Sequence, residues 1–221
     1  MSLIGAEREV VRVVTILQPF FMSYAHAGPD SNLAAERFYK ELRGDLQTLV
    51  GLPVGTDMGF FDTEGLRPAV RWRDELAAAL GNCQVLVALL SVPYLHSEWC
   101  GKEWHAFTLR EREPRPGGRP VQNQGAIIPV RWAPIPFPLP SVVQDEVQIF
   151  KPQSTPGLPD LPQLYEKEGV FGLLRMRQEE AFSRIVWDLA NCIQQIYYSQ
   201  RLKPRIFIPD ELRNIFEGGL P

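Results

Sequence analysis

Short apolar runs and longer amphipathic segments alternate along the first two thirds of the chain. Four apolar runs have the length of strands and are bounded by polar or turn residues: 18–24, 58–61, 84–91 and 126–132. Three segments between them carry apolar residues at helical spacing: 31–50, 72–80 and 99–112. The run at 84–91 is the most apolar, and we expect it to be a central strand because a parallel strand is buried on both faces.

The first helical segment shows the pattern in detail. Its expected buried positions recur at helical spacing: Leu33, Phe38, Leu42, Leu46, Leu49 and Val50. Asp30 or Ser31 is expected to cap its start, and Gly51 to end it. The helix at 72–80 is expected to stop at Gly81–Asn82, because such residues favour helix C-termini.

The second half of the chain changes in composition. Residues 113–162 hold twelve of the 20 prolines, and the alternating segment 133–140 is expected to be extended. A helical turn is expected at 165–169, followed by a long helix at 178–201 with one apolar stripe. The organisation that we expect comprises four parts: an N-terminal segment 1–17, whose run 10–17 could be helix or strand, a domain 18–165, its C-terminal helical part 166–203, and a tail or linker 204–221.

This order of elements predicts an α/β fold with a parallel sheet and helices on both faces. In such sheets, ligands bind at the carboxyl ends of the strands, beside a topological switch point. The loops that follow Tyr24, Phe61 and Leu90 lie at that edge, so they are the loops in which a site is expected.

Composition and charge argue against a nucleic-acid-binding, membrane-spanning or secreted protein. The chain of 221 residues is 45% hydrophobic and 22% charged, with a net charge of -3 and no polybasic stripe, so nucleic-acid binding is not expected. No apolar run reaches the ~18–20 residues that cross a bilayer, and no signal peptide is evident. Three cysteines without metal-ligand spacing fit a reducing, cytoplasmic protein.

Common catalytic motifs are absent, and few single residues stand out. The sequence has no phosphate-binding loop, dinucleotide fingerprint or nucleophile elbow. The histidines are scattered, and Cys100 has no sequence neighbour that would activate it. Trp99 and Glu103 are four residues apart at the start of a helix, so they share a face. This pair could bind a planar cationic group, but from spacing alone a helix-terminal acid and a packed tryptophan are favoured.

Three segments, in order and at matching spacing, resemble the TIR (Toll/interleukin-1 receptor) domain family. The first is Phe20-Phe21-Met22-Ser23-Tyr24, and the second runs from Asp57 to Asp62 with Gly65 and Trp72 after it. The third, Cys83–Ser91 followed by Pro93-Tyr94-Leu95-His96-Ser97-Glu98-Trp99-Cys100-Gly101-Lys102-Glu103, is similar to the S-P-x-Y-x-x-S-x-W-C-x-x-E segment of bacterial and plant members. The C-terminal part more loosely resembles the actinobacterial FxsC-like group.

The resemblance implies a flavodoxin-like three-layer sandwich with strand order 2-1-3-4-5 and an α-helical C-terminal extension. It also implies an NAD+ hydrolase or cyclase that cleaves the nicotinamide–ribose bond. Glu103 would be the catalytic carboxylate, with NAD+ as substrate and no metal or cofactor. The substrate-binding residues would be Ser23, Tyr24, Ala25, His26, Asp62, Trp72 and Trp99. Some members have an arginine where His26 stands, which leaves phosphate binding there open.

The resemblance also implies a role in assembly for the loop after the second strand. It would assemble with a neighbouring subunit or lie over the pocket, through Thr63, Glu64, Gly65, Leu66, Arg67 and Pro68. Self-association would activate the enzyme, in an anti-phage or stress response, and a sensor domain or partner protein could supply the trigger. Two other functions stay open: a non-catalytic adaptor that binds other TIR domains, and an accessory protein of a peptide-modification cluster.

Overall fold

The structure is a computed structural model of the chain. It describes residues 17–53, 55–61, 69–118 and 125–217, and for residues 69–72 the backbone alone. The apolar run at 10–17, except Leu17, and the loop 62–68 lie outside the described residues.

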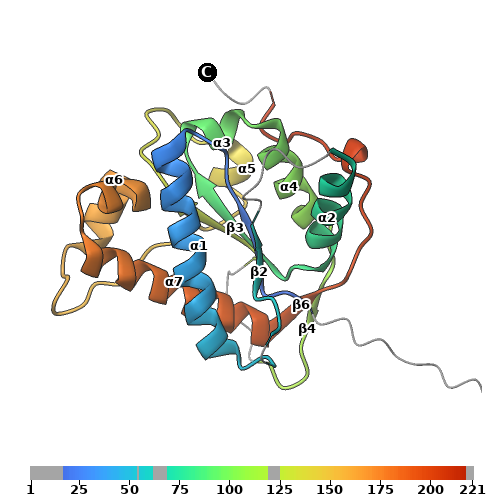
Figure 1. The fold of residues 1–221 in the computed structure, drawn as a ribbon, viewed down its shortest axis with the longest axis horizontal. Coiled ribbons are helices and arrows are strands. Elements are labelled where there is room, and N and C mark those ends of the chain that lie inside the picture. The colour runs from blue at the N-terminus through green and yellow to red at the C-terminus, as the bar shows by residue number, and fades with distance from the viewer. Residues whose placement is uncertain (1–16, 54, 62–68, 119–124, 218–221) are drawn as a thin grey trace, which may run out of the picture.

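A four-stranded parallel sheet forms the centre of the fold (Figure 1). Its strands, in spatial order, are β2 (Gly59–Phe61), β1 (Phe20–Ser23), β3 (Val85–Leu90) and β5 (Ile127–Arg131). All four predicted strands are therefore present, and β3 is buried along its whole length. The flavodoxin-like α/β fold class is confirmed, with four strands of the expected order among the described residues.

The outer edge of β5 is covered by an irregular segment. Phe150 N donates to Pro129 O at 2.9 Å, but Pro129 has no N–H to donate in return. A proline is tolerated in an edge strand where its missing N–H would face outward. Pro129 therefore prevents a regular ladder on this edge.

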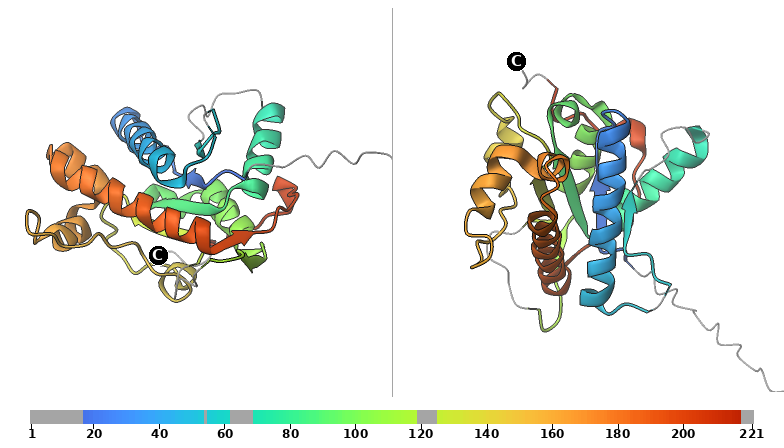
Figure 2. Two further views of the ribbon diagram at one scale, coloured as in Figure 1. Left: turned by 90° about the horizontal axis from the view of Figure 1, so that it is seen from below. Right: turned by 60° about the vertical axis from the view of Figure 1, so that its left-hand side comes forward.

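Helices cover both faces of the sheet. On one face lie α1 (Pro29–Val50), α6 (Leu161–Arg175) and α7 (Glu179–Ser199). Figure 2 shows α1 and α7 side by side. The other face carries α2 (Ala69–Asn82), α3 (Val92–His96) and α4 (Glu98–Thr108).

Three shorter elements complete the fold. The short helix α5 (Ser141–Gln144) follows the proline-rich segment. A separate antiparallel pair joins β4 (Arg112–Pro114) to β6 (Gln200–Leu202), and a 3-10 helix follows at Pro209–Glu211.

Alternation along β1 divides the interior into two apolar clusters. Phe20, Met22 and Tyr24 contribute to the cluster under α1 and α7. Phe21 and Ala25 contribute to the cluster under α2 and α4. This period of two determines which of the predicted site residues can meet.

The start of α1 differs from the prediction. The helix begins at Pro29 with Gly28 as N-cap, and no side chain caps it. Asp30 and Ser31 thus lie inside the first turn. Gly28 has φ 110, a conformation suited to glycine, and proline is favoured in the first turn. The predicted stripe holds from Phe38 onward, but Leu33 is 64% exposed.

Three helix predictions were also wrong in their limits. The helix expected at 72–80 runs from Ala69 to Asn82, so Gly81 and Asn82, which were expected to stop it, are its last two residues. The helix expected at 99–112 is α4, which begins at Glu98 and ends at Thr108. A separate short helix, α3, precedes it, because Ser91 and Ser97 each accept a hydrogen bond from a backbone N–H three residues later. The expected end of α4, Arg112, lies in β4. The turn expected at 165–169 belongs to the longer helix α6, which is kinked at Gly169 with φ 66. Gly51, by contrast, ends α1 as predicted, and the structure shows it in the left-handed conformation.

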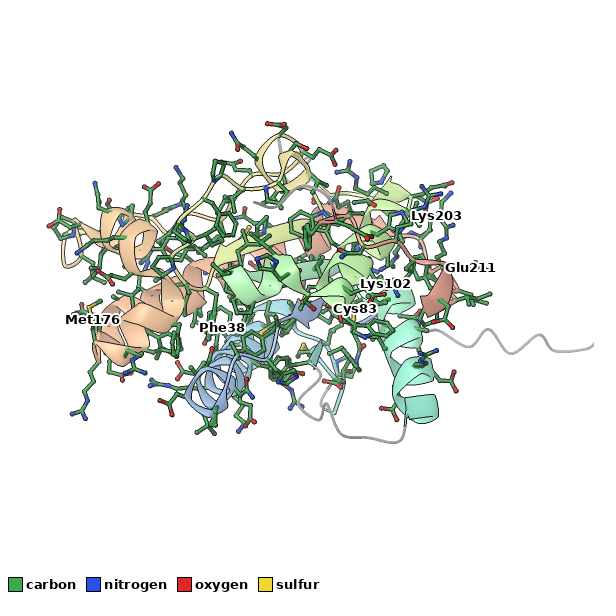
Figure 3. All side chains as sticks on the ribbon, turned by 90° about the horizontal axis from the view of Figure 1, so that it is seen from above. Phe38, Cys83, Lys102, Met176, Lys203 and Glu211 are labelled. Atoms are coloured by element: carbon green, nitrogen blue, oxygen red, sulfur yellow. The ribbon has the colours of Figure 1, made fainter. Side chains whose placement is uncertain are left out.

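The segment 203–217 packs along α2 and α4, and all but its first residue lies in the stretch 204–221 that we expected to be a tail or linker. Arg205 N donates to Gly81 O at 3.2 Å, and Gly81 is helical within α2. Phe207, Leu212 and Phe216 are buried in the cluster under α2 and α4. Lys203 and Glu211 mark the course of this segment in Figure 3. Apolar side chains at irregular spacing therefore anchor it to the domain.

Candidate functional site

The corner where β3 passes into α4 holds Glu103. The strand β3 ends at Leu90. Two helices, α3 and α4, begin within the next eight residues, and each is capped by a serine. Ser91 Oγ accepts from Tyr94 N at 3.2 Å, and Ser97 Oγ accepts from Cys100 N at 3.3 Å. These caps set the direction of α4, which carries Glu103 about one turn after its start.

Glu103 contacts the end of β1 through Ser23. Ser23 Oγ is hydrogen-bonded to Glu103 Oε2 and lies 3.0 Å from Tyr94 Oη. All three residues are buried, with Glu103 8% exposed, Ser23 1% and Tyr94 0%. The loops after β1 and β3 therefore converge on one carboxylate, as the sheet topology predicts.

The protons in this cluster follow from the groups present. Ser23 has a single hydroxyl proton, so all three oxygens are satisfied when Tyr94 donates to Ser23 and Ser23 donates to Glu103. Burial, the largest cause, and the nearby charge of Glu103 raise the pKa of Tyr94 well above its usual 10. Tyr94 thus keeps its proton, and the two hydroxyls hold the Glu103 carboxylate in one orientation.

Cys100 lies in the same cluster and is not an activated thiol. It is 2% exposed. Burial, followed by the charge of Glu103, raises the pKa of its thiol above the usual 9. Cys100 therefore stays protonated at neutral pH. Because the thiolate is the nucleophilic form, Cys100 serves as a packing residue.

Trp99 lies on α4, half-buried, beside a lysine. Lys102 Nζ is 4.9 Å from the centre of the Trp99 ring and 2.5 Å from Glu98 Oε1. Lys102, labelled in Figure 3, has a side chain only 14% exposed. A planar substrate would therefore stack on the same face of Trp99 only after the ammonium moved away.

The loop after β1 splits the other predicted residues between two environments. Tyr24 points away from Ser23, and its Oη lies 2.8 Å from Ser31 Oγ and 3.0 Å from Asn32 Oδ1. Burial, the largest cause, raises the pKa of Tyr24. Ala25 is buried under α2 and α4, on the Ser23 side. His26 is exposed, with its ring 5.7 Å from that of Tyr24.

Some predicted residues cannot be placed. Asp62 and the loop residues Thr63 to Pro68 lie outside the described residues. The backbone of Trp72 belongs to the first turn of α2, but its side chain is not described. That Asp62 and the side chain of Trp72 border the Glu103 corner thus stays a prediction.

The part of the chain that the structure describes shows neither a metal-binding cluster nor a membrane helix. It contains no group of three or more His, Cys, Asp or Glu side chains placed to hold a metal ion. None of its helices combines the length and apolar character needed to span a bilayer.

Sequence reasoning missed two residues of the corner. Tyr94 and Lys102 were parts of the quoted segment but received no role. In Ser91-Val92-Pro93-Tyr94 the tyrosine lies one turn after the serine cap, and this spacing, which places its side chain toward the strand ends, was the available signal. No sequence signal indicated that Lys102 covers Trp99.

Comparison with protein-family models matches residues 20–153 to the model described as TIR domain. The match spans more than half of the 221 residues and includes the whole sheet and α4. It ends before α6 and α7. Neither the curated proteins nor the solved structures contain a significant match.

Proposed function

The chain belongs to the TIR domain family, and from this premise we propose that it hydrolyses NAD+ at the nicotinamide–ribose bond. TIR domains include both NAD+ hydrolases and non-catalytic adaptors, so the site must decide between them. The observation that carries the proposal is the Glu103 carboxylate, which the Ser23 hydroxyl orients at the strand ends.

Cleavage of the nicotinamide–ribose bond requires a carboxylate and no strong general acid. Nicotinamide leaves as a neutral ring from a cationic one, so no strong general acid is needed. The ribose then gains oxocarbenium-like positive charge. A fixed carboxylate stabilises such charge, as it does in glycoside hydrolysis. In this proposal Glu103 holds the ribose hydroxyls and stabilises that charge, while Ser23 and Tyr94 position Glu103.

The surrounding residues receive roles that depend on this proposal. Trp99 walls the nicotinamide side, with Lys102 turned outward when substrate is bound. Tyr24, Ala25 and His26 form the loop beside the ribose and phosphates. Asp62 and Trp72 border the pocket from the second strand and its loop.

We place self-association in the same proposal. Residues Thr63 to Pro68 contact a neighbouring copy and complete the site, as TIR domains commonly self-associate. A cytoplasmic bacterial protein of the FxsC-like group that is activated by assembly fits the resemblance. NAD+ is the substrate, and the chemistry requires no bound metal or cofactor.

Nicotinamide release is the measurement that tests the proposal. Concentrated protein, with and without a crowding agent, is incubated with NAD+, and nicotinamide is quantified by chromatography. The wild-type protein releases nicotinamide, and Glu103→Gln reduces the rate by roughly 100-fold or more, the scale of a lost transition-state contact. Glu36→Gln, a change on the surface of α1, serves as the matched control and keeps the wild-type rate.

A specific observation favours the adaptor as second candidate. The Glu103 side chain is hydrogen-bonded and only 8% exposed, and Lys102 covers one face of Trp99. This conformation of the corner is closed. If an assembled wild-type protein releases no nicotinamide, the enzyme is excluded and the adaptor stands. If Glu103→Gln releases nicotinamide at the wild-type rate, Glu103 is excluded as the catalytic carboxylate.

A further inference from the structure

A groove separate from the Glu103 corner lies between α7, β5 and the segment 148–153. Its volume is about 470 Å³. Its floor is apolar, with Ile127 and Ile128 from the start of β5. Glu103 follows the carboxyl end of β3, whereas this groove borders the amino end of a parallel neighbour. The groove and the corner are thus at opposite ends of the sheet.

The polar wall of the groove is held in place by one carboxylate. Asp188 Oδ1 accepts from Arg184 Nη2 at 2.7 Å, and Asp188 Oδ2 accepts from Gln153 N at 3.0 Å. The Asp188 side chain is 11% exposed and that of Arg184 33%. Asp188 therefore fixes the Arg184 guanidinium on α7 and ties segment 148–153 to the same helix.

Arg184 retains hydrogen-bonding capacity. Its Nε–H is buried and has no acceptor among the described residues. A buried donor without an acceptor is costly, particularly on a charged group. An anion seated in the groove that draws the guanidinium slightly toward it would satisfy this donor. The guanidinium also matches phosphate or carboxylate geometry.

Two further side chains define the class of ligand. Lys151 is exposed at the rim and adds a second cation. Trp187 lines the groove while 40% exposed, so part of its ring is open to solvent. Aromatic faces stack on flat rings such as nucleotide bases. Amide side chains from Gln153 and Asn191 also line the groove and can supply donors and acceptors.

We propose that this groove is a second binding site, which takes a nucleotide: its base stacks on Trp187 and its phosphate is held by Arg184 and Lys151. Arg184 and Trp187, which hold the phosphate and the base in this proposal, both lie on α7, outside the matched residues 20–153. The proposal does not depend on NAD+ hydrolysis, because no groove residue belongs to the Glu103 cluster.

The experiment titrates ADP into the full chain and records tryptophan fluorescence together with calorimetric heat. ADP is expected to bind and to quench fluorescence. Trp187→Phe removes the quenching assigned to stacking. Lys151→Gln, a surface change that leaves the fold intact, weakens ADP binding roughly 10-fold, the scale of a lost charge-assisted hydrogen bond. Arg184→Gln weakens it by at least as much.

Controls separate this site from the corner. Arg43→Gln, on the surface of α1, and Glu103→Gln leave ADP affinity and quenching unchanged. Circular dichroism establishes that each variant is folded. Absence of ADP binding by the wild-type chain at millimolar concentration would overturn the proposal. So would quenching that persists in Trp187→Phe together with an affinity that Lys151→Gln does not alter.

Discussion

Ser23 illustrates how much one small side chain can determine. It is buried at the end of β1, and its hydroxyl reaches a carboxylate 80 residues later in the chain. Alanine at this position would leave Glu103 without the hydrogen bond that Ser23 donates. Ser23 thus orients the Glu103 carboxylate, in the way that supporting hydrogen bonds hold functional side chains in place.

Ser23→Ala is therefore expected to lower kcat for nicotinamide release by roughly 10- to 100-fold, because a hydrogen bond to a charged group contributes about 1.5–3 kcal/mol. KM changes little, since the lost contact is with Glu103. Tyr94→Phe has a smaller effect in the same direction. Steady-state kinetics on the assembled protein measures both values. Equal kcat in wild-type and Ser23→Ala protein would contradict the positioning role.

His105 shows a second effect of a single group. Its Nδ1 accepts from Arg213 N at 3.0 Å. Burial, followed by the charges of Arg213 and Arg205, lowers its pKa below the ordinary 6.5. The neutral form is thus the one that holds segment 203–217 on α4.

The sign of the pH dependence follows from this shift. The unfolded chain binds the proton more readily than the folded chain, so the stabilisation is complete above pH 6.5. It is lost as the pH falls from 6.5 through the lower folded pKa. His105→Asn keeps an acceptor and removes the titration, so urea unfolding between pH 5 and 8 should show a flatter profile for the variant. Matching profiles would rule out this contribution.

At the scale of elements, the segment 203–217 that packs on α4 restricts which residues this helix can contain. Gly101 lies within this helix, where glycine is normally unfavourable. A Cβ at this position would lie 1.9 Å from Asn214 Oδ1 and 3.2 Å from Asn214 Cα. Close approach of segment 203–217 therefore requires glycine here, and helix propensity gives way to packing.

Gly101→Ala should lower the free energy of unfolding by about 1–3 kcal/mol, the usual cost of overpacking. Gly44→Ala is the matched control, because Gly44 lies in α1 with open space around it. It should raise stability by about 0.5–1 kcal/mol. Adding Asn214→Ala to Gly101→Ala should restore part of the loss. Denaturant unfolding measures all three, and equal effects of the two alanines would refute the packing argument.

At the scale of the whole molecule, Arg110 joins segments that are distant in sequence. Its guanidinium donates to Leu80 O at 3.0 Å, to Cys83 O, and to the backbone oxygens of Leu202 and Lys203. It is 5% exposed, and burial lowers its pKa to about 10. The end of α2, the start of β3 and the chain after α7 thus depend on one cation.

Arg110→Met should lower the free energy of unfolding by about 3–5 kcal/mol, because it leaves buried carbonyls unpaired. Arg175→Met serves as control, since Arg175 forms an exposed pair with Asp30 at 3.5 Å. Its loss should be far smaller. Urea denaturation at neutral pH compares the two. Similar losses would show that the backbone carbonyls find other partners.

The sequence by itself determined the alternation of elements and the strands of the sheet. Apolar runs and helical periodicity are local properties, so they predicted the four sheet strands, the long helix α7 and the place of Glu103 at the strand ends. The TIR resemblance extended this prediction to the family, which the family match bears out.

Only the tertiary structure decided which side chains meet. Tyr24 and Ser23 are neighbours in sequence, yet the pleat sends them into different clusters. The packing of segment 203–217, the cover of Lys102 over Trp99 and the groove along α7 join residues from distant elements. No local period encodes such contacts, because they depend on how helices and loops pack on the finished sheet.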